Sequence, residues 1–497
     1  MHSEETPPAL VLGGPWVTAL AVIRDLGRSG IRSYAVGTGR SFVSYSRWHR
    51  ALPGPQDTAV TPSSLDSLLR EVPFERMVLI PCSDEWALAV AGLDPALAAR
   101  FPASVAPRKS VEALVDKARF AEVLDDLGVP HPWTARLGPG NDLMRLPDGA
   151  FQDAFLKPRN SQAFSRRYGV KAFRFGARGE AVALANGARE AGLELMLQEY
   201  IPGLATCHYM VEGFVDRTGS VRARFVRQRL RMYPPDFGDS TYMVSTPLDA
   251  VEGAVAPLDR LLTALDYRGV FEAEFKYDER DDQFKLLEVN SRPWAFIGFA
   301  ATCGVGFCKM IYRDALALPV ESVHGYEVGR HCIVPFPDTF GCWQLVREGR
   351  LTPWAWGFSW MRARQLVFSW DDPAPAAASF VDLLHYILRR WGTPGTTCLS
   401  SSSSLPTSSG PTRENPVTLL PGRAKLVTSL SATGSPTPMK TIGRVLVACL
   451  AARAPAVPPP ATMTSTLSAA SSAESAGSRS TFPSASRYSI TRLRPST

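Results

Sequence analysis

Apolar and polar positions alternate regularly over the first hundred residues of the chain. Residues 9–12 are apolar, a Gly-Gly-Pro turn follows, and residues 19–26 have the pattern of a helix. Residues 33–36 and 77–80 are further strand candidates, and an alanine-rich helical segment follows the second one. Because strands alternate with helices, this pattern predicts an α/β domain with a parallel sheet over residues 1–110.

The clearest hairpin lies in the middle of the chain. Residues 271–277 alternate apolar with charged side chains, which is the period of a strand. A polar turn follows, and a second strand ends in Asn290. If the hairpin is symmetric about Asp281, Glu274 lies directly opposite Glu288, and Asn290 lies on the same face as Glu288.

Two opposed carboxylates need a physical explanation. Side chains paired across a ladder are about 5 Å apart, and like charges at that distance are destabilising. The pair Glu274 and Glu288 therefore predicts either a raised carboxyl pKa or a bound cation. Two carboxylates, the amide oxygen of Asn290 and ligand phosphates are typical of a magnesium site, and Arg292 is placed to bind anionic oxygens. The alternative is a solvated hairpin with charged faces, and the pattern alone does not decide between the two.

Three other segments carry weaker signals. A strand ends in Lys157, and a polar loop over residues 159–169 leads to a returning strand that contains Lys171. The apolar strand from residue 195 and the Pro-Gly turn after residue 201 suit a hinge between two lobes, and Lys117 lies in a helical pattern. Taken singly, each is also compatible with a surface lysine, an ordinary turn or a solvated helix face.

In this order and spacing the four segments resemble the ATP-grasp superfamily, in particular the carboxylate–amine ligases related to D-aspartate ligase and the carbamoyl-phosphate synthase domains. The most specific match is the phrase LLEVNSRPW, residues 286–294. The resemblance implies that the α/β domain precedes a two-lobed α+β domain over residues 111–392. Its small lobe is expected at about 111–200 and its large lobe at about 201–392.

The resemblance also assigns roles to single residues. The magnesium ligands, or manganese ligands if that ion is used, are Glu274, Glu288 and Asn290. The lysines expected near the ATP phosphates are Lys117, Lys157 and Lys171. The hinge expected to hold adenine is Gln198, Glu199, Tyr200 and Ile201, with Glu199 as the main side-chain contact. Arg292 is expected to steady the transferred phosphoryl group or the acyl phosphate.

The chain departs from the family pattern in two places. The phosphate-covering loop of the family is rich in glycine, whereas residues 159–168 contain none. No acidic residue that would hold the ATP ribose follows the hinge, where residues 206–208 are Thr-Cys-His. The arginine-rich segment after residue 224 supplies Arg229 and Arg231, which we expect to clamp a substrate carboxylate. A strand with an ordinary basic face is the equal alternative.

Composition narrows the class of protein. The net charge of +7 comes from a Ser/Thr/Pro/Ala-rich tail, residues 393–497, which has almost no acidic residues and which we expect to be disordered. The remaining chain is near neutral and has no basic patch, so a nucleic-acid partner is not expected. Eight scattered cysteines without a CxxC motif indicate reduced thiols in the cytoplasm. No apolar run is long enough to cross a bilayer, so no membrane partner is expected.

The sequence therefore predicts a ligase that uses ATP and magnesium to activate a carboxylate as an acyl phosphate and to join it to an amine. Both substrates are expected to be small molecules, and a homodimer is left open. The alternatives are an ATP-grasp kinase or phosphotransferase with a hydroxyl acceptor, and a non-catalytic nucleotide-binding protein.

Overall fold

The computed structural model describes residues 6–13, 16–37, 41–53, 60–137, 142–234 and 238–391 of the 497. The tail expected to be disordered, residues 393–497, lies outside the described residues, as does part of the Gly-Gly-Pro turn after the first strand.

The N-terminal region contains a parallel sheet, as predicted. Its strands, in the order β2-β1-β3, are β1 (Ala9–Leu12), β2 (Ser33–Val36) and β3 (Val78–Pro81). Its helices are α1 (Trp16–Arg28), α2 (Leu65–Glu71), α3 (Asp84–Ala91) and α4 (Pro95–Arg100). Strand β3 begins and ends one residue later than predicted, because Val78 pairs with the first residue of β1 and Pro81 with its last.

A small antiparallel sheet follows. Its strands, in the order β4-β6-β5, are β4 (Thr134–Arg136), β5 (Ala154–Pro158) and β6 (Leu195–Glu199). The helices of this region are α5 (Arg108–Val115), α6 (Lys117–Asp126), α7 (Ser161–Tyr168) and α8 (Arg178–Glu190).

Residues 159–173 fold differently from the prediction of a polar loop and a returning strand. They contain helix α7, and of the expected strand only Phe173 pairs, through a single bridge to Leu156. Phe164 and Tyr168 lie one turn apart on the same helix face, and their rings contact Phe173 at centroid distances of 4.8 and 5.0 Å. This apolar contact stabilises a helix where the polar composition had indicated a loop.

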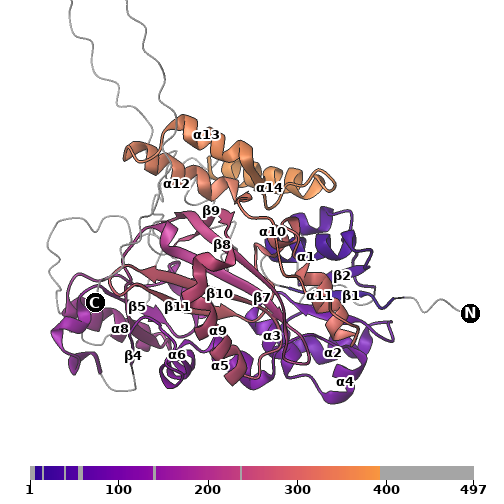
Figure 1. Ribbon diagram of the computed structural model, residues 1–497, viewed down its shortest axis with the longest axis horizontal. Coiled ribbons are helices and arrows are strands. Elements are labelled where there is room, and N and C mark those ends of the chain that lie inside the picture. Colours follow the sequence, from indigo (N-terminus) through magenta and orange to yellow (C-terminus); the bar gives the residue numbers. More distant parts are fainter. Residues whose placement is uncertain are drawn as a thin grey trace, which may run out of the picture. The chain divides into compact units, whose positions relative to one another are not determined.

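The largest sheet has seven strands in the order β11-β10-β7-β8-β9-β12-β13 and runs through the middle of Figure 1. The strands are β7 (His208–Val215), β8 (Val221–Tyr233), β9 (Asp239–Ser245), β10 (Gly269–Asp278), β11 (Gln283–Asn290), β12 (His331–Ile333) and β13 (Ala363–Gln365). The helices after β9 are α9 (Glu252–Ala264), α10 (Ile297–Thr302), α11 (Phe307–Ala315), α12 (Pro335–Arg347), α13 (Pro353–Arg362) and α14 (Ala374–Trp391).

The two faces of strand β10 have different surroundings. Phe271, Ala273 and Phe275 share one core with residues of α5 and α9. On the opposite face, Val270 packs into the core that includes α10 and α11, and the side chains become charged from Glu272 onward. The candidate site lies on this charged part of the sheet.

The predicted hairpin register is right at the candidate site and wrong near the turn. Glu274 pairs directly with Glu288, as the symmetry about Asp281 requires. The register then shifts, and Phe275 pairs with Leu286. A β-bulge accounts for the difference, since one strand has an extra residue at that point.

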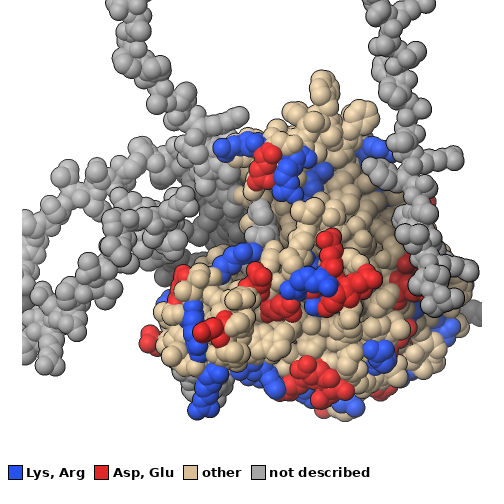
Figure 2. Space-filling model, turned by 60° about the vertical axis from the view of Figure 1, so that its left-hand side comes forward, with Lys and Arg blue, Asp and Glu red and all other residues tan. Residues whose placement is uncertain are grey.

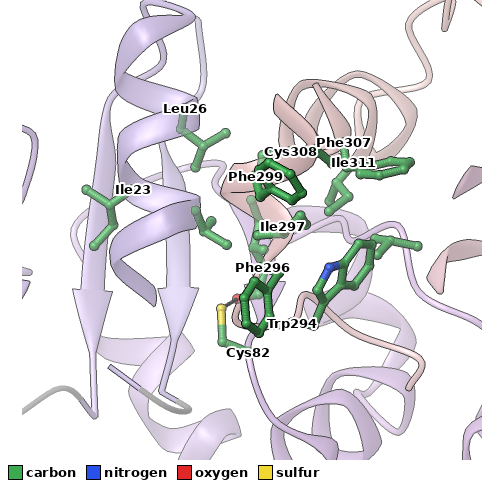
Figure 3. Packing of buried hydrophobic residues seen from close by; sticks show 14 of the residues in the cluster. Ile23, Leu26, Cys82, Trp294, Phe296, Ile297, Phe299, Phe307, Cys308 and Ile311 are labelled. Carbon is green, nitrogen blue, oxygen red and sulfur yellow. Dashed lines mark hydrogen bonds between the residues drawn. The ribbon is translucent and has the colours of Figure 1, made fainter. Parts of the chain in front are cut away.

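The N-terminal α/β region and the helices after the hairpin share a hydrophobic core. Ile23 and Leu26 of α1 belong to the same cluster as Phe299, Phe307 and Ile311 of α10 and α11, and Figure 3 shows these side chains together. The parallel sheet is confirmed, whereas the domain and lobe boundaries expected near residues 110 and 200 stay predictions.

Candidate active site

Two carboxylates face each other on the charged face of the sheet, Glu274 on β10 and Glu288 on β11. Oε1 of Glu274 accepts hydrogen bonds from Nη2 of Arg229 and, when the proton is on Nδ1, from His208, both at 2.9 Å. Oε2 of Glu288 lies 3.3 Å from Nζ of Lys117. Within the described residues, Oε2 of Glu274 and Oε1 of Glu288 have no hydrogen-bond partner.

Basic neighbours and their hydrogen bonds keep both carboxylates ionised. Burial raises the pKa of Glu274, but Arg229 and His208 outweigh this effect and hold that pKa well below its ordinary value. The charge of Lys117 lowers the pKa of Glu288, against burial and against the charge of Glu274. Of the two consequences predicted for the pair, the raised carboxyl pKa is therefore wrong, because the sequence did not reveal these basic neighbours.

The oxygen atoms of the site fit a hard divalent cation. Magnesium is usually bound by one or two protein carboxylates, with substrate phosphates and water completing its shell. Oδ1 of Asn290 accepts a hydrogen bond from Nη2 of Arg292 at 3.0 Å, and Nδ2 of Asn290 donates to Oε2 of Glu272 at 2.9 Å. An amide oxygen has a second lone pair that can bind a metal. No group of three or more His, Cys, Asp or Glu side chains suited to a metal occurs in the part of the chain that the structure describes, so Asn290 or ligand oxygens have to complete the set.

A pocket beside the carboxylates brings together Lys117, Lys157, Gln198 and Glu288. Its other lining residues are Leu114, Phe120, Ala121, Leu124, His131, Pro132, Thr134, Leu286 and Leu287. Nζ of Lys157 lies 3.3 Å from Oε1 of Gln198, and Nε2 of Gln198 donates to Oγ1 of Thr134 at 2.9 Å. Burial, assisted by the charge of Lys117, lowers the pKa of Lys157 to about 7. The pocket thus holds the amino groups of Lys117 and Lys157. An anion that enters the pocket stabilises the charged form of Lys157.

The predicted adenine hinge is only partly at this pocket, because Gln198 lines it and the next three residues do not. Oε2 of Glu199 accepts a hydrogen bond from the N–H of Trp133 at 3.1 Å, and Oε1 of Glu199 is paired with Arg280. The carboxylate of Glu199 is therefore engaged by the protein on both sides. Its contact with adenine stays a prediction, as do the roles of the other hinge residues.

Two of the predicted basic residues, Lys171 and Arg231, are paired with carboxylates of the protein. Nζ of Lys171 lies 2.5 Å from Oδ1 of Asp239, and both side chains are exposed. Arg231 is buried and forms a two-point ion pair with Asp338, at 2.8 and 2.7 Å. Helix α12 thus supplies a carboxylate that the local sequence did not indicate, and this carboxylate engages the guanidinium that was expected to clamp a substrate. Arg229, in contrast, lies within the site.

Arg292 connects the N-terminal α/β region to the site. Its Nε donates to Oδ1 of Asp84, the first residue of α3, at 3.0 Å, while its Nη2 reaches Asn290. The guanidinium is therefore held from two elements that lie far apart in the sequence, which fixes its plane beside the end of strand β11.

Several buried charges of the site were not among the predicted residues. Arg227 is buried between Glu212 and Glu272 and forms ion pairs with both. Complete burial raises the pKa of Glu212 to about 8, although Arg227 opposes this shift. The period of the strand would have placed Glu272 on the same face as Glu274. The sequence around His208 did not indicate its contact with Glu274, because the two residues lie on different strands.

No protein-family model matches the chain. The D-aspartate ligase of Enterococcus faecium (strain Aus0004) is 26% identical over 254 residues, which cover 48% of this chain and 59% of that protein. The D-alanine–D-alanine ligase of Caulobacter sp. (strain K31) is 30% identical over 187 residues, which cover 36% of this chain and 56% of that protein. The matched part thus spans less than two thirds of the length of either curated relative.

Two solved structures resemble the fold. The biotin carboxylase domain of the 2-oxoglutarate carboxylase of Hydrogenobacter thermophilus, solved with MgADP, ADP and bicarbonate, has a TM-score of 0.51 at 18% identity, over 66% of this chain and 74% of that one. The carboxyaminoimidazole ribonucleotide synthase of Aspergillus clavatus, solved with ATP, has a TM-score of 0.51 at 15% identity, over 70% of this chain and 87% of that one. At these identities the likeness shows a shared fold.

Proposed function

This chain has an ATP-grasp fold, as its sequence predicted, and from this premise we propose that it is an ATP- and magnesium-dependent carboxylate–amine ligase. The γ-phosphoryl group of ATP passes to a substrate carboxylate and forms an acyl phosphate. An amine then attacks the acyl carbon, phosphate leaves, and an amide results. This chemistry depends mainly on positioning and on charge neutralisation, and it needs no nucleophile from the protein.

The residues of the site suit these tasks. Glu274, Glu288 and Asn290 would hold magnesium, which would neutralise phosphate oxygens when bound. Lys117 and Lys157 line the same pocket and would bind phosphate oxygens through charge-assisted hydrogen bonds. Arg292, next to Asn290, would hold the oxygens of the transferred phosphoryl group.

The single observation that carries the proposal is the pairing of Glu274 with Glu288. Both carboxylates are ionised, each has one oxygen without a hydrogen-bond partner in the described residues, and Lys117 of the adjoining pocket contacts Glu288. A solvated hairpin face would not concentrate buried cations around two opposed acids.

We propose an amino acid as one substrate. The two curated relatives are named for D-aspartate and D-alanine, so these are the first compounds to test. Both offer a carboxylate for activation and an amine for the second step, and Arg292 is a suitable partner for an anionic group.

The remaining partners are proposed to be small molecules of the cytoplasm. Six cysteines among the described residues are free thiols, which suits a reducing compartment. None of the helices in the described ranges has the length and apolarity of a membrane span. Basic and acidic side chains are interspersed on the face shown in Figure 2. We also propose that two copies of the chain form a homodimer, and light scattering would test this by the molar mass in solution.

The proposal is tested by measuring ADP release with amino acids and small carboxylates, each with and without hydroxylamine. Hydroxylamine captures an acyl phosphate as a hydroxamate. A ligase releases ADP and gives a hydroxamate that depends on the carboxylate. A phosphorylated product that survives hydroxylamine would identify a kinase, and ATP binding without ADP release would identify a nucleotide-binding protein.

A further inference from the structure

A buried lysine holds the hinge that follows strand β6. Nζ of Lys276, a residue that is 5% exposed, donates to the carbonyl oxygen of Ile201 at 2.6 Å. The same Nζ lies 5.0 Å from the ring centroid of Tyr200. Lys276 is two residues from Glu274 on β10 and pairs with His208, the first residue of β7. The hinge is thus attached to the strand that carries the carboxylate pair.

The hydrogen bond from Lys276 engages the one polar group of the peptide between Ile201 and Pro202. The residue after Ile201 is Pro202, which has no N–H, so the peptide between them offers only the Ile201 carbonyl. A charge-assisted hydrogen bond to that oxygen restrains the orientation of Ile201.

The N–H of Ile201 has no hydrogen-bond partner within the described residues, although the residue is 3% exposed. The neighbouring N–H of Tyr200 donates to the carbonyl oxygen of Asp153 at 2.5 Å. Buried backbone N–H groups are nearly always paired in native proteins, so the N–H of Ile201 is a donor that a ligand acceptor could satisfy.

We infer that Lys276 is a positioning residue for recognition of the nucleobase. By holding the carbonyl of Ile201, it directs the N–H of Ile201 toward a ring nitrogen that accepts a hydrogen bond. N1 of adenine is such an acceptor. N1 of guanine carries a hydrogen, so two hydrogen-bond donors would face each other there. The inference rests on the proposed function and on the adenine hinge that the sequence resemblance predicts.

The test compares the dissociation constants of Mg-ATP and Mg-GTP for the full chain and its Lys276→Met, Lys276→Arg and Lys276→Gln variants, by calorimetry. Lys276→Met should weaken ATP binding by about tenfold and change GTP binding by less than about twofold. Lys276→Arg keeps a charged donor and should retain most of the preference for ATP. Lys309→Met, an exposed lysine on α11, is the control and should match the wild type.

Two further readouts separate base recognition from other roles. Mn²⁺ binding, followed by electron paramagnetic resonance, should be unchanged in Lys276→Met, and altered Mn²⁺ binding would overturn the inference in favour of a role at the metal site. An unchanged ratio of ATP to GTP affinity in a folded Lys276→Met protein would also overturn it. If that variant does not fold, Lys276→Gln decides by the same ratio. A wild-type protein that binds no ATP would refute the proposed function itself.

Discussion

Glu274 and Glu288 lie directly opposite each other across strands β10 and β11, and both are ionised because basic side chains compensate their charge. Arg229 and His208 hold one oxygen of Glu274, and Lys117 holds one oxygen of Glu288. The remaining oxygens have no hydrogen-bond partner in the described ranges. The protein without metal therefore carries less repulsion than two opposed acids would suggest, and the pair is ready to accept a cation without first losing a proton.

His208 should support metal binding by fixing Glu274. Its Nδ1 lies 2.9 Å from Oε1 of Glu274, and groups that orient metal ligands typically contribute about 10- to 100-fold to affinity or activity. We expect His208→Ala to weaken Mn²⁺ binding by about tenfold in electron paramagnetic resonance titrations, and His208→Asn, which keeps a donor near Nδ1, to lose less. His324→Ala, on an exposed residue, is the control. Equal Mn²⁺ affinity in His208→Ala would remove His208 from the site.

ATP binding should take up a proton at Lys157. Burial and Lys117 lower the pKa of this amine to about 7, while Glu288 and Glu274 act in the opposite direction. At about pH 8 the amine is therefore mostly neutral in the free protein, and phosphate oxygens would raise its pKa on binding. ATP affinity should fall as the pH rises above the pKa of the free protein. Calorimetry in buffers of different ionisation enthalpy should give an uptake close to one proton per ATP.

Two variants check the assignment of that proton. Lys157→Met should bind ATP more weakly and abolish the uptake, whereas Lys109→Met, on the exposed side of α5, should leave both unchanged. Proton uptake that persists in Lys157→Met would assign it to another group.

The ion pair between Arg231 and Asp338 should stabilise the fold and not bind substrate. Asp338 is completely buried, and it also accepts hydrogen bonds from Thr241 and from Nε1 of Trp360, both at 2.8 Å. Asp338→Asn leaves a buried guanidinium without its countercharge, so urea unfolding should show a loss of about 3–5 kcal/mol in the free energy of unfolding. The KM for the carboxylate substrate should stay near the wild-type value.

The control for this prediction is Asp382→Asn, on an exposed position of α14, which should not change stability. A raised KM with unchanged stability in Asp338→Asn would return Arg231 to the substrate site, as the arginine-rich strand had indicated.

Local patterns predicted the parts of the structure that depend on neighbours in the sequence. The parallel sheet and the opposition of Glu274 and Glu288 follow from strand periodicity and turn position. The β-bulge after Glu274 was missed, because a shift by one residue leaves no mark in the alternation. Helix α7 was missed because Phe164 is buried by contacts with Tyr168 and Phe173 that only the folded chain brings together.

The partners of the predicted charges came from distant elements and could not be predicted. Asp338 is 107 residues from Arg231, and Asp84 is 208 residues from Arg292. The residue pattern within one strand does not indicate that a carboxylate from a distant element will contact an arginine of that strand. The sequence therefore predicted which two acids face each other on the hairpin, while the structure was needed to show that Arg229 contacts Glu274 and Arg231 contacts Asp338.

The most direct measurement is magnesium-dependent ADP formation by Glu288→Gln, in the presence of D-aspartate or D-alanine and hydroxylamine. The substitution removes one charge at nearly constant shape, and the exposed fraction of 39% for Glu288 limits the loss of stability from its pair with Lys117 to about 1 kcal/mol. We predict a folded variant whose ADP and hydroxamate formation falls by about a hundredfold or more, with Glu190→Gln on exposed α8 as active as the wild type. A folded Glu288→Gln protein that turns over ATP at close to the wild-type rate would contradict the magnesium site and the ligase proposed from it.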